Sequence, residues 1–308
     1  MTNQQQYLRR CNLIVATDKG EGLDLSNLRI KFSIKKSDAQ TPNTAEITVY
    51  NLAEDTANRI RKEFSSINLQ AGYESNYGVI FAGNIKQVRL GRENGTDTYI
   101  VIAAADGDAA YNGAVVNATL AAGAKQSDQI NASAGAMAGK GVQKGHIADT
   151  GSAKLPRGKV MYGMARDYLR QSAAASNTSW SIQDGKIQFV ELTGVLPNQA
   201  VVLNSKTGLI GTPEQTNDGI KARCLLNPML KIGGKVLIDE KDIAEAKLPD
   251  TKKDAQANKP ATIAHDGLYR VLLVEYQGDT RGNDWYSDLV CLDIDATQPP
   301  GKQVKKNG

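Results

Sequence analysis

Hydrophobic and polar residues alternate along much of this chain, which is the pattern of strands that bury one face. In the clearest case, residues 28–35, Leu28, Ile30, Phe32 and Ile34 share one face, and mainly charged residues occupy the other. This alternation predicts a half-buried antiparallel strand.

Two sets of predicted strands follow one another in the same order near the two ends of the chain. The first set comprises strands at 45–52 and 67–73 and a hairpin at 81–102. The second set comprises strands at 220–228 and 230–236 and a hairpin at 268–294. The shared order predicts an internal duplication, in which one chain carries two equivalent β modules and three chains would make a ring of six.

The region between the two sets has a different composition. Ala and Gly dominate 114–145, and helices are predicted at 127–138 and 160–174, the second because apolar residues cluster on one side of it. A hairpin is predicted at 177–190, because Asp184-Gly185 is a strong signal for a two-residue turn. These elements predict a small α+β insert between the two β modules.

Together the patterns predict a mainly β fold that consists of two tandem β-barrel modules and a small α+β insert. We expect the first module at 1–108, the insert at 109–205, the second module at 206–296 and a disordered basic tail at 297–308. A polar break at 245–259 is predicted to be a mobile loop that joins two strands. A chain of 308 residues is long enough for each part to have its own core.

Charge and cysteine content narrow the classes of partner. The net charge is +4, but acidic and basic residues are interleaved, so the basic stripe with stacking aromatics that marks a nucleic-acid binder is missing from the sequence. The polar N-terminus and the lack of a run of about 20 apolar residues predict neither Sec secretion nor membrane insertion. The three widely spaced cysteines, Cys11, Cys224 and Cys291, are expected to be reduced structural thiols made in a cytoplasm.

The sequence offers few candidates for chemistry. His146 and His265 lie in separate segments without metal-ligand spacing. Asp279, Asp284 and Asp288 lack the spacing of a calcium loop and favour turn chemistry instead. We therefore expect no catalytic residues, no cofactor, no metal and no enzymatic activity, and predict a protein that works by its shape.

Several strings resemble baseplate hub proteins of contractile-tailed bacteriophages. In the first module they are Leu28-Arg-Ile-Lys-Phe-Ser-Ile, Pro42-Asn-Thr-Ala-Glu-Ile-Thr-Val-Tyr-Asn-Leu52 and Phe81-Ala-Gly-Asn-Ile. In the second they are Asn227-Pro-Met-Leu-Lys-Ile-Gly-Gly, Gly267-Leu-Tyr-Arg-Val and Gly278-Asp-Thr-Arg-Gly-Asn-Asp-Trp285. The resemblance covers 13–295, and the string that begins at Pro42 is its most specific part.

The resemblance implies two tandem tail-tube-like β-barrel modules per subunit and a homotrimer that forms a pseudo-sixfold ring. Such a ring joins a hexameric tail tube, or a tube-initiator protein, to a trimeric spike or cell-puncturing protein, and contacts other baseplate proteins. Phage DNA is implied only in transit through the lumen. The implied location is the tail baseplate of the virion, assembled in the host cytoplasm.

Ring closure is expected to use exposed strand edges of adjacent modules. The candidate inter-subunit edge residues are Leu28, Ile30, Lys31 and Phe32 in the first module and Ile220, Lys221, Ala222 and Cys224 in the second. The insert, which is poor in apolar residues, is expected at the periphery of the ring, away from the lumen.

Two other functions stay open. One is a distal tail-tip or tube-initiator protein of a non-contractile tail or a phage-like particle. The other is a peptidoglycan-binding or lytic tail protein, since the helix and hairpin predicted at 160–190 resemble a small wall-binding fold. A lytic role would need a pair of carboxylates flanking a glycosidic bond, and the sequence offers no such pair that can be placed.

Overall fold

The computed structural model describes residues 8–239, 241, 243–244, 263–264 and 267–294. The predicted loop at 245–259 and the predicted tail at 297–308 lie outside the described residues. Within them the chain forms eighteen strands and four helices, so the mainly β fold class is confirmed.

The N-terminal part contains seven strands and one helix, and long alternating stretches become long strands. The elements are β1 (Arg9–Thr17), β2 (Gly22–Asp24), β3 (Ile30–Ser37), β4 (Thr44–Tyr50), α1 (Glu54–Glu63), β5 (Phe64–Tyr73), β6 (Asn76–Arg92) and β7 (Thr98–Ala105). In β3, Ile30, Phe32 and Ile34 are buried and the residues between them are exposed, as the alternation predicts.

The middle part is a mixed α/β unit with its own core. The elements are α2 (Asp108–Gly113), β8 (Val115–Leu120), α3 (Gln126–Ala138), β9 (Gln143–Ile147), β10 (Lys159–Met164), α4 (Ala165–Ala175), β11 (Thr178–Gln183) and β12 (Lys186–Glu191). Its core gathers around the fully buried Trp180, Met161, Leu169 and Phe189.

The predicted helix at 160–174 is wrong in its first turn, because residues 159–164 form β10. Met161 points into the core while Val160 and Tyr162 point outward, which is strand alternation. Strand β8 pairs with this segment along its whole length, so a ladder that is distant in sequence outweighs the local helical spacing. The hairpin at 177–190 and its Asp184-Gly185 turn are confirmed.

The C-terminal part adds six strands. They are β13 (Val201–Val202), β14 (Leu209–Thr216), β15 (Gly219–Leu225), β16 (Lys235–Leu237), β17 (Leu268–Asp279) and β18 (Trp285–Asp293). Cys224 and Cys291 are buried within them, as the strand alternation around both residues predicts.

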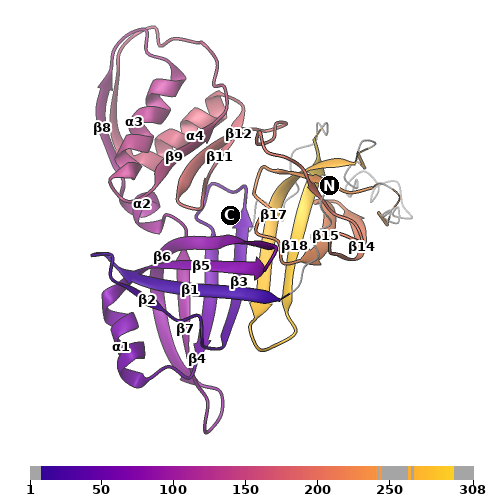
Figure 1. Ribbon diagram of the computed structural model, residues 1–308. Coiled ribbons are helices and arrows are strands. Elements are labelled where there is room, and N and C mark those ends of the chain that lie inside the picture. Colours follow the sequence, from indigo (N-terminus) through magenta and orange to yellow (C-terminus); the bar gives the residue numbers. More distant parts are fainter. Residues whose placement is uncertain (1–7, 240, 242, 245–262, 265–266, 295–308) are drawn as a thin grey trace, which may run out of the picture.

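All strands outside the middle part belong to one sheet of thirteen strands (Figure 1). Its order is β14-β15-β18-β17-β3-β4-β7-β6-β5-β1-β2, with β16 paired to β17 and β13 paired to β16. Two tandem barrels are not observed, since this path does not close among the described residues. The physical reason is that β17 pairs with β18 on one side and with β3 on the other, which merges both modules around one shared core.

The strand connectivity that the duplication predicts is nevertheless present. The first module has the order β3-β4-β7-β6-β5-β1 and the second has β14-β15-β18-β17-β16-β13, so the strands correspond one to one in chain order. They differ at the last step, where β1 is antiparallel to β5 but β13 is parallel to β16. Both long hairpins carry a β-bulge at the same position, between Ile85 and Gln87 and between Val271 and Leu273.

Candidate assembly surface

Eight consecutive strands of the sheet, from β14 to β6, share one polar side that we call the free face. The opposite side of these strands packs into the shared core. The charged residues of the free face are Lys31, Lys35, Glu46, Arg89, Glu214, Lys221, Arg223, Glu275 and Asp288. Because neighbouring strands place side chains of the same face opposite each other, these charges meet across the strands.

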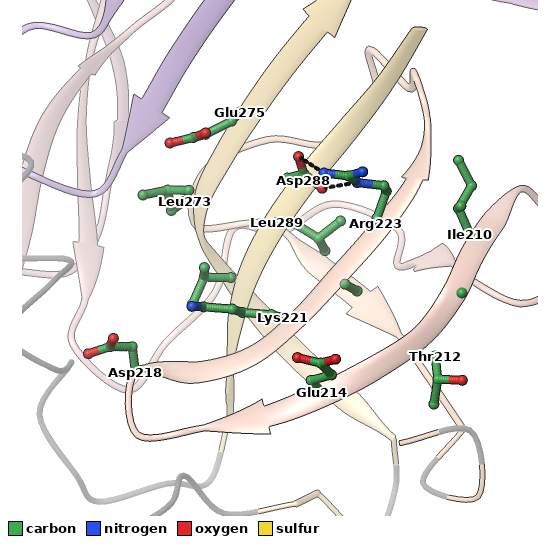
Figure 2. Close-up of a pocket in the computed structure, with 13 residues that line it drawn as sticks. Ile210, Thr212, Glu214, Asp218, Lys221, Arg223, Leu273, Glu275, Asp288 and Leu289 are labelled. Atoms are coloured by element: carbon green, nitrogen blue, oxygen red, sulfur yellow. Dashed lines mark hydrogen bonds and ion pairs between the residues drawn. The ribbon is translucent and has the colours of Figure 1, made fainter. Parts of the chain in front are cut away.

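Three ion pairs on the free face join different strands; two link adjacent strands, and the third links β6 to β4 across β7. They are Lys35 with Glu275 at 3.1 Å, Arg223 with Asp288 at 2.6 Å and Arg89 with Glu46 at 3.2 Å. Figure 2 shows the second of these in a shallow hollow, which Ile210 and Lys221 also line. Cations and anions therefore alternate across this surface, which carries no single-sign patch along these three pairs.

The prediction that 28–35 and 220–226 are open edges is wrong. Strand β3, with Ile30, Lys31 and Phe32, is paired to β4 on one side and to β17 on the other. Leu28 precedes β3 and donates its backbone N–H to Leu25. A proline at Lys31 would therefore break a ladder inside the fold.

Strand β15 is also an interior strand. It contains Ile220, Lys221, Ala222 and Cys224, and it is paired to β14 and to β18. The residues that the sequence singles out thus lie beside strands that come from elsewhere in the chain, and their role between subunits stays a prediction.

The first open edge in the described sheet is the second half of β6. Strand β5 pairs with β6 only as far as Asn84, while β7 pairs with the remainder on the other side. Residues 87–92 therefore have a strand partner on one side alone within the described part of the chain. Leu90 lies on this edge and is 46% exposed.

The second open edge is β14, at the opposite end of the sheet. Its outer side meets only a short bridge among the described residues, in which Ala244 donates to Pro213 and accepts from Gln215. Gly211, at a positive φ of 70°, and Pro213 interrupt the strand, and Pro213 has no N–H to donate to a neighbouring strand. Ile210 lies on this edge and is 41% exposed.

The insert is fastened to both modules by a cluster of four charged side chains at the tip of its β11–β12 hairpin, of which Lys36 and Asp106 are buried. Backbone N–H groups of Asp184 and Gly185 donate to the two carboxylate oxygens of Asp106, at 2.6 and 2.8 Å. The Asp184 carboxylate accepts hydrogen bonds from Lys36 and from Lys231, the latter at 2.9 Å. Lys36 and Asp106 belong to the first module and Lys231 to the second, so one turn ties three parts together.

Burial and neighbouring charges shift the pKa values of these groups in opposite directions. Burial alone would raise the pKa of Asp184, but Lys36 and Lys231 outweigh it and hold that pKa below the usual range. Burial lowers the pKa of Lys36. It raises the pKa of Asp106 to about 6, against the opposing effect of Lys36.

We expect Asp106 to make stability pH-dependent between its ordinary pKa of 3.8 and about 6. Because its pKa is raised by folding, the folded chain binds this proton more tightly than the unfolded chain, and stability falls as the pH rises through that window. The slope is at most about 1.4 kcal/mol per pH unit. Urea unfolding of the wild type and of Asp106→Asn across this window measures it, and a difference between them that stays constant with pH would contradict the expectation.

Arg270 of β17 makes a second anchor, through a buried ion pair with the first module and hydrogen bonds to the end of the insert. Arg270, which is 3% exposed, donates to Asp38 at 2.5 Å and to the carbonyl oxygens of Glu191, Leu192 and Gly194. The flat guanidinium group can serve several acceptors in its plane at once, which a lysine cannot do. Both anchors lie on the core side of the sheet or at strand ends, so the insert leaves the free face uncovered.

The aspartates, cysteines and histidines that the sequence offers for chemistry have structural roles or positions instead. Asp279 accepts from the N–H of Arg281 and pairs with Arg29 at 2.7 Å, which is turn chemistry. Burial raises the pKa of the Cys224 thiol to about 12. His146 lies in β9, and His265 lies outside the described residues.

Two kinds of feature are missing from the described part of the chain. No group of three or more His, Cys, Asp and Glu side chains is placed to hold a metal ion. None of the helices has the length and apolar character needed to cross a membrane.

Comparison with known proteins gives one family and several similar folds. A family model described as baseplate hub gp41 matches residues 12–241. No curated protein sequence matches the chain.

Two similar structures are described as the 43 kDa tail protein of prophage MuSo2 from Shewanella oneidensis and a tail protein from Neisseria meningitidis. The first is 6% identical, with a TM-score of 0.58 over 94% of this chain and 98% of the other. The second is 8% identical, with a TM-score of 0.57 over 92% and 96%.

A third similar structure is an Escherichia coli protein. It is described as a component of the type VI secretion system with structural similarity to the T4 bacteriophage tail proteins gp27 and gp5. It is 9% identical, with a TM-score of 0.54 over 96% of this chain and 80% of the other. At these identities the likeness shows a shared fold.

Proposed function

Because the chain belongs to the baseplate hub gp41 family, we propose that it is a structural hub of a phage-type tail, three copies of which form a pseudo-sixfold ring. The observation that carries this proposal is the repeat of one strand connectivity within a single chain. Three chains with two equivalent modules each supply six similar positions while the ring keeps three-fold symmetry. Such a ring fits a hexameric tail tube or tube-initiator protein on one side and a trimeric spike on the other.

In this proposal the free face lines the channel and the insert faces outward. The contacts that fasten the insert, made by Asp184 and Arg270, support this arrangement, because they leave the free face open. Val160 and Tyr162, 72% and 76% exposed on β10, offer the insert an apolar surface for other baseplate proteins. Phage DNA would pass through the channel without being held.

The proposed setting is the tail baseplate of the virion, after assembly in the host cytoplasm and without membrane insertion. The fold shared with the Escherichia coli secretion-system protein, whose description names two T4 tail proteins, supports a spike-type partner. A tail-tip or tube-initiator role in a non-contractile or phage-like particle would use the same ring and is the nearest alternative.

We propose a structural rather than an enzymatic role. The acids Asp38, Asp106 and Asp184 all hold backbone or cationic partners within the fold, and this supports a purely structural use. The alternative is a peptidoglycan-binding or lytic protein, with the insert as the wall-binding part. A zymogram of the purified chain tests it, since a cleared band would overturn the structural role.

We expect the chain to form a trimer in solution, of about 99 kDa from three chains of 33.1 kDa. Light scattering measures this mass over a wide range of concentrations, and electron microscopy of the same sample shows the symmetry of the particle. A ring with two-fold or fourfold symmetry, or a monomer that persists in the presence of purified tail tube and spike, would contradict the proposal.

A further inference from the structure

Inside the chain, the two modules meet at one pair of antiparallel strands, which shows how such modules can join. Strand β17 runs antiparallel to β3, with residues 273–279 opposite residues 37–31 and Tyr276 opposite Ile34. The junction is tight, since a Cβ on Gly278 would lie 2.3 Å from the Phe32 ring. It is also charged, with Lys35 paired to Glu275 across it.

Each strand of this junction has a counterpart that stands at an open edge. The shared bulge aligns β6 with β17, so that Leu90 corresponds to Tyr276. The pairing of β4 and β15 with their neighbours aligns β3 with β14, so that Ile34 corresponds to Gln215. The counterpart of β17 is therefore β6 and the counterpart of β3 is β14, and these two strands are open at opposite ends of the sheet.

We infer that β14 of one chain packs antiparallel along residues 87–92 of β6 in a second copy, in the register of the β17–β3 junction. Leu90 of one copy then lies opposite Gln215 of the next. This inference rests on the proposed ring and names the strands that close it. Three copies would alternate three junctions within chains and three between chains.

The exposure of Leu90 supports this pairing. Its counterpart Tyr276 is 1% exposed, with Ile34 of β3 opposite it and its hydroxyl bonded to the carbonyl of Leu230, whereas Leu90 is 46% exposed. A second copy placed beside β6 would cover the exposed part of Leu90. Burial of this side chain is favourable, because it removes apolar surface from water.

Charge complementarity also supports it. In the junction within the chain, β3 carries the cation Lys35 and β17 the anion Glu275. At the open edges the signs are exchanged, with Arg89 on β6 and Glu214 on β14, both on the free face. Each junction therefore joins a basic strand to an acidic one, and two copies of β6 would repel each other.

The short bridge at β14 must open when the second copy arrives. Ala244 occupies the N–H of Gln215 and the carbonyl of Pro213, through two hydrogen bonds of 3.0 and 2.7 Å. Gly211 and Pro213 limit the ladder that β6 can form with β14. We therefore expect side-chain packing around Leu90 to contribute more to this junction than backbone pairing.

Cysteine cross-linking tests the register. Opposite residues in an antiparallel pair have Cα atoms about 5 Å apart, which suits a disulfide. In a Cys11→Ser background, a mixture of Leu90→Cys chains and Gln215→Cys chains should give a covalent dimer under oxidation. A chain with both substitutions should give a covalent trimer. Leu90→Cys paired with Val160→Cys on the insert is the control and should stay uncoupled.

The outcomes separate this inference from the proposed ring. A trimeric mass without cross-linking, or cross-linking as strong in the control pair, would overturn the junction and leave the ring standing. A chain with no trimer under any condition would overturn both. In support, Leu90→Glu should weaken trimer formation at least about tenfold while the melting of the subunit stays cooperative, because a charge in an interface costs more than 1.4 kcal/mol when it is unpaired.

Discussion

Replacing Arg270 with Met will lower the free energy of unfolding by about 3–5 kcal/mol, because Asp38 will be left as a buried charge without its partner. Burial already raises the pKa of Asp38 with Arg270 in place. Three backbone carbonyls would lose their donor in the same substitution. Urea unfolding of the purified chain measures the loss.

A matched control lies on the free face. Arg223 makes the same kind of pair with Asp288, but its side chain is 48% exposed, so Arg223→Met should cost less than about 1 kcal/mol. The double variant Arg270→Met with Asp38→Asn should recover part of the loss, since it removes the unpaired charge. Equal losses in Arg270→Met and Arg223→Met would show that burial does not decide the strength of these pairs.

Replacing Asp184 with Ala is expected to loosen the insert from both modules, with a loss of about 3–5 kcal/mol from the buried Lys36 that it leaves unpaired. The residue also has a left-handed backbone with φ of 53°, which an alanine adopts at a cost of about 1 kcal/mol. Asp184→Asn keeps the turn and removes only the charge. The difference between the two variants separates the backbone from the ion pairs.

The two tryptophans report on the two parts of the chain separately. Trp180 lies in the core of the insert and Trp285 in the core of the sheet. We expect Trp180 fluorescence to change at lower urea than Trp285 fluorescence in Asp184→Ala, measured in single-tryptophan variants made with Phe. Asp167→Ala, which removes only an exposed pair with Arg170, is the control, and coincident transitions in Asp184→Ala would contradict the role of the cluster.

The local features of the fold could be predicted from the sequence, because their physical cause is local. Alternation predicted β3, and the Asp184-Gly185 dipeptide predicted the hairpin that anchors the insert. The shared order of strands predicted the repeat of connectivity. Each of these signals lies within a few residues or in the spacing of short segments.

The errors share a different cause, which is pairing between distant segments. Lys31 and Lys221 read as outward positions on edge strands, but β17 and β14 lie beside those strands. The ion pair of Arg270 with Asp38 joins residues 232 positions apart, and no local pattern marks either as buried. The length of β6 relative to β5 was the available clue to the true open edge.

The three ion pairs of the free face have a consequence for a polymer that slides along it. Their cations, Lys35, Arg89 and Arg223, already have carboxylate partners, so a passing phosphate chain would have to displace those carboxylates before it could dock. The phosphate polymer would release few of its condensed counterions. The gain in entropy from counterion release, which makes DNA bind to basic surfaces, would therefore be small. In a channel lined by this face, electrostatic friction would be low and almost independent of salt concentration, so that the genome would pass at a rate set by pressure and not by binding.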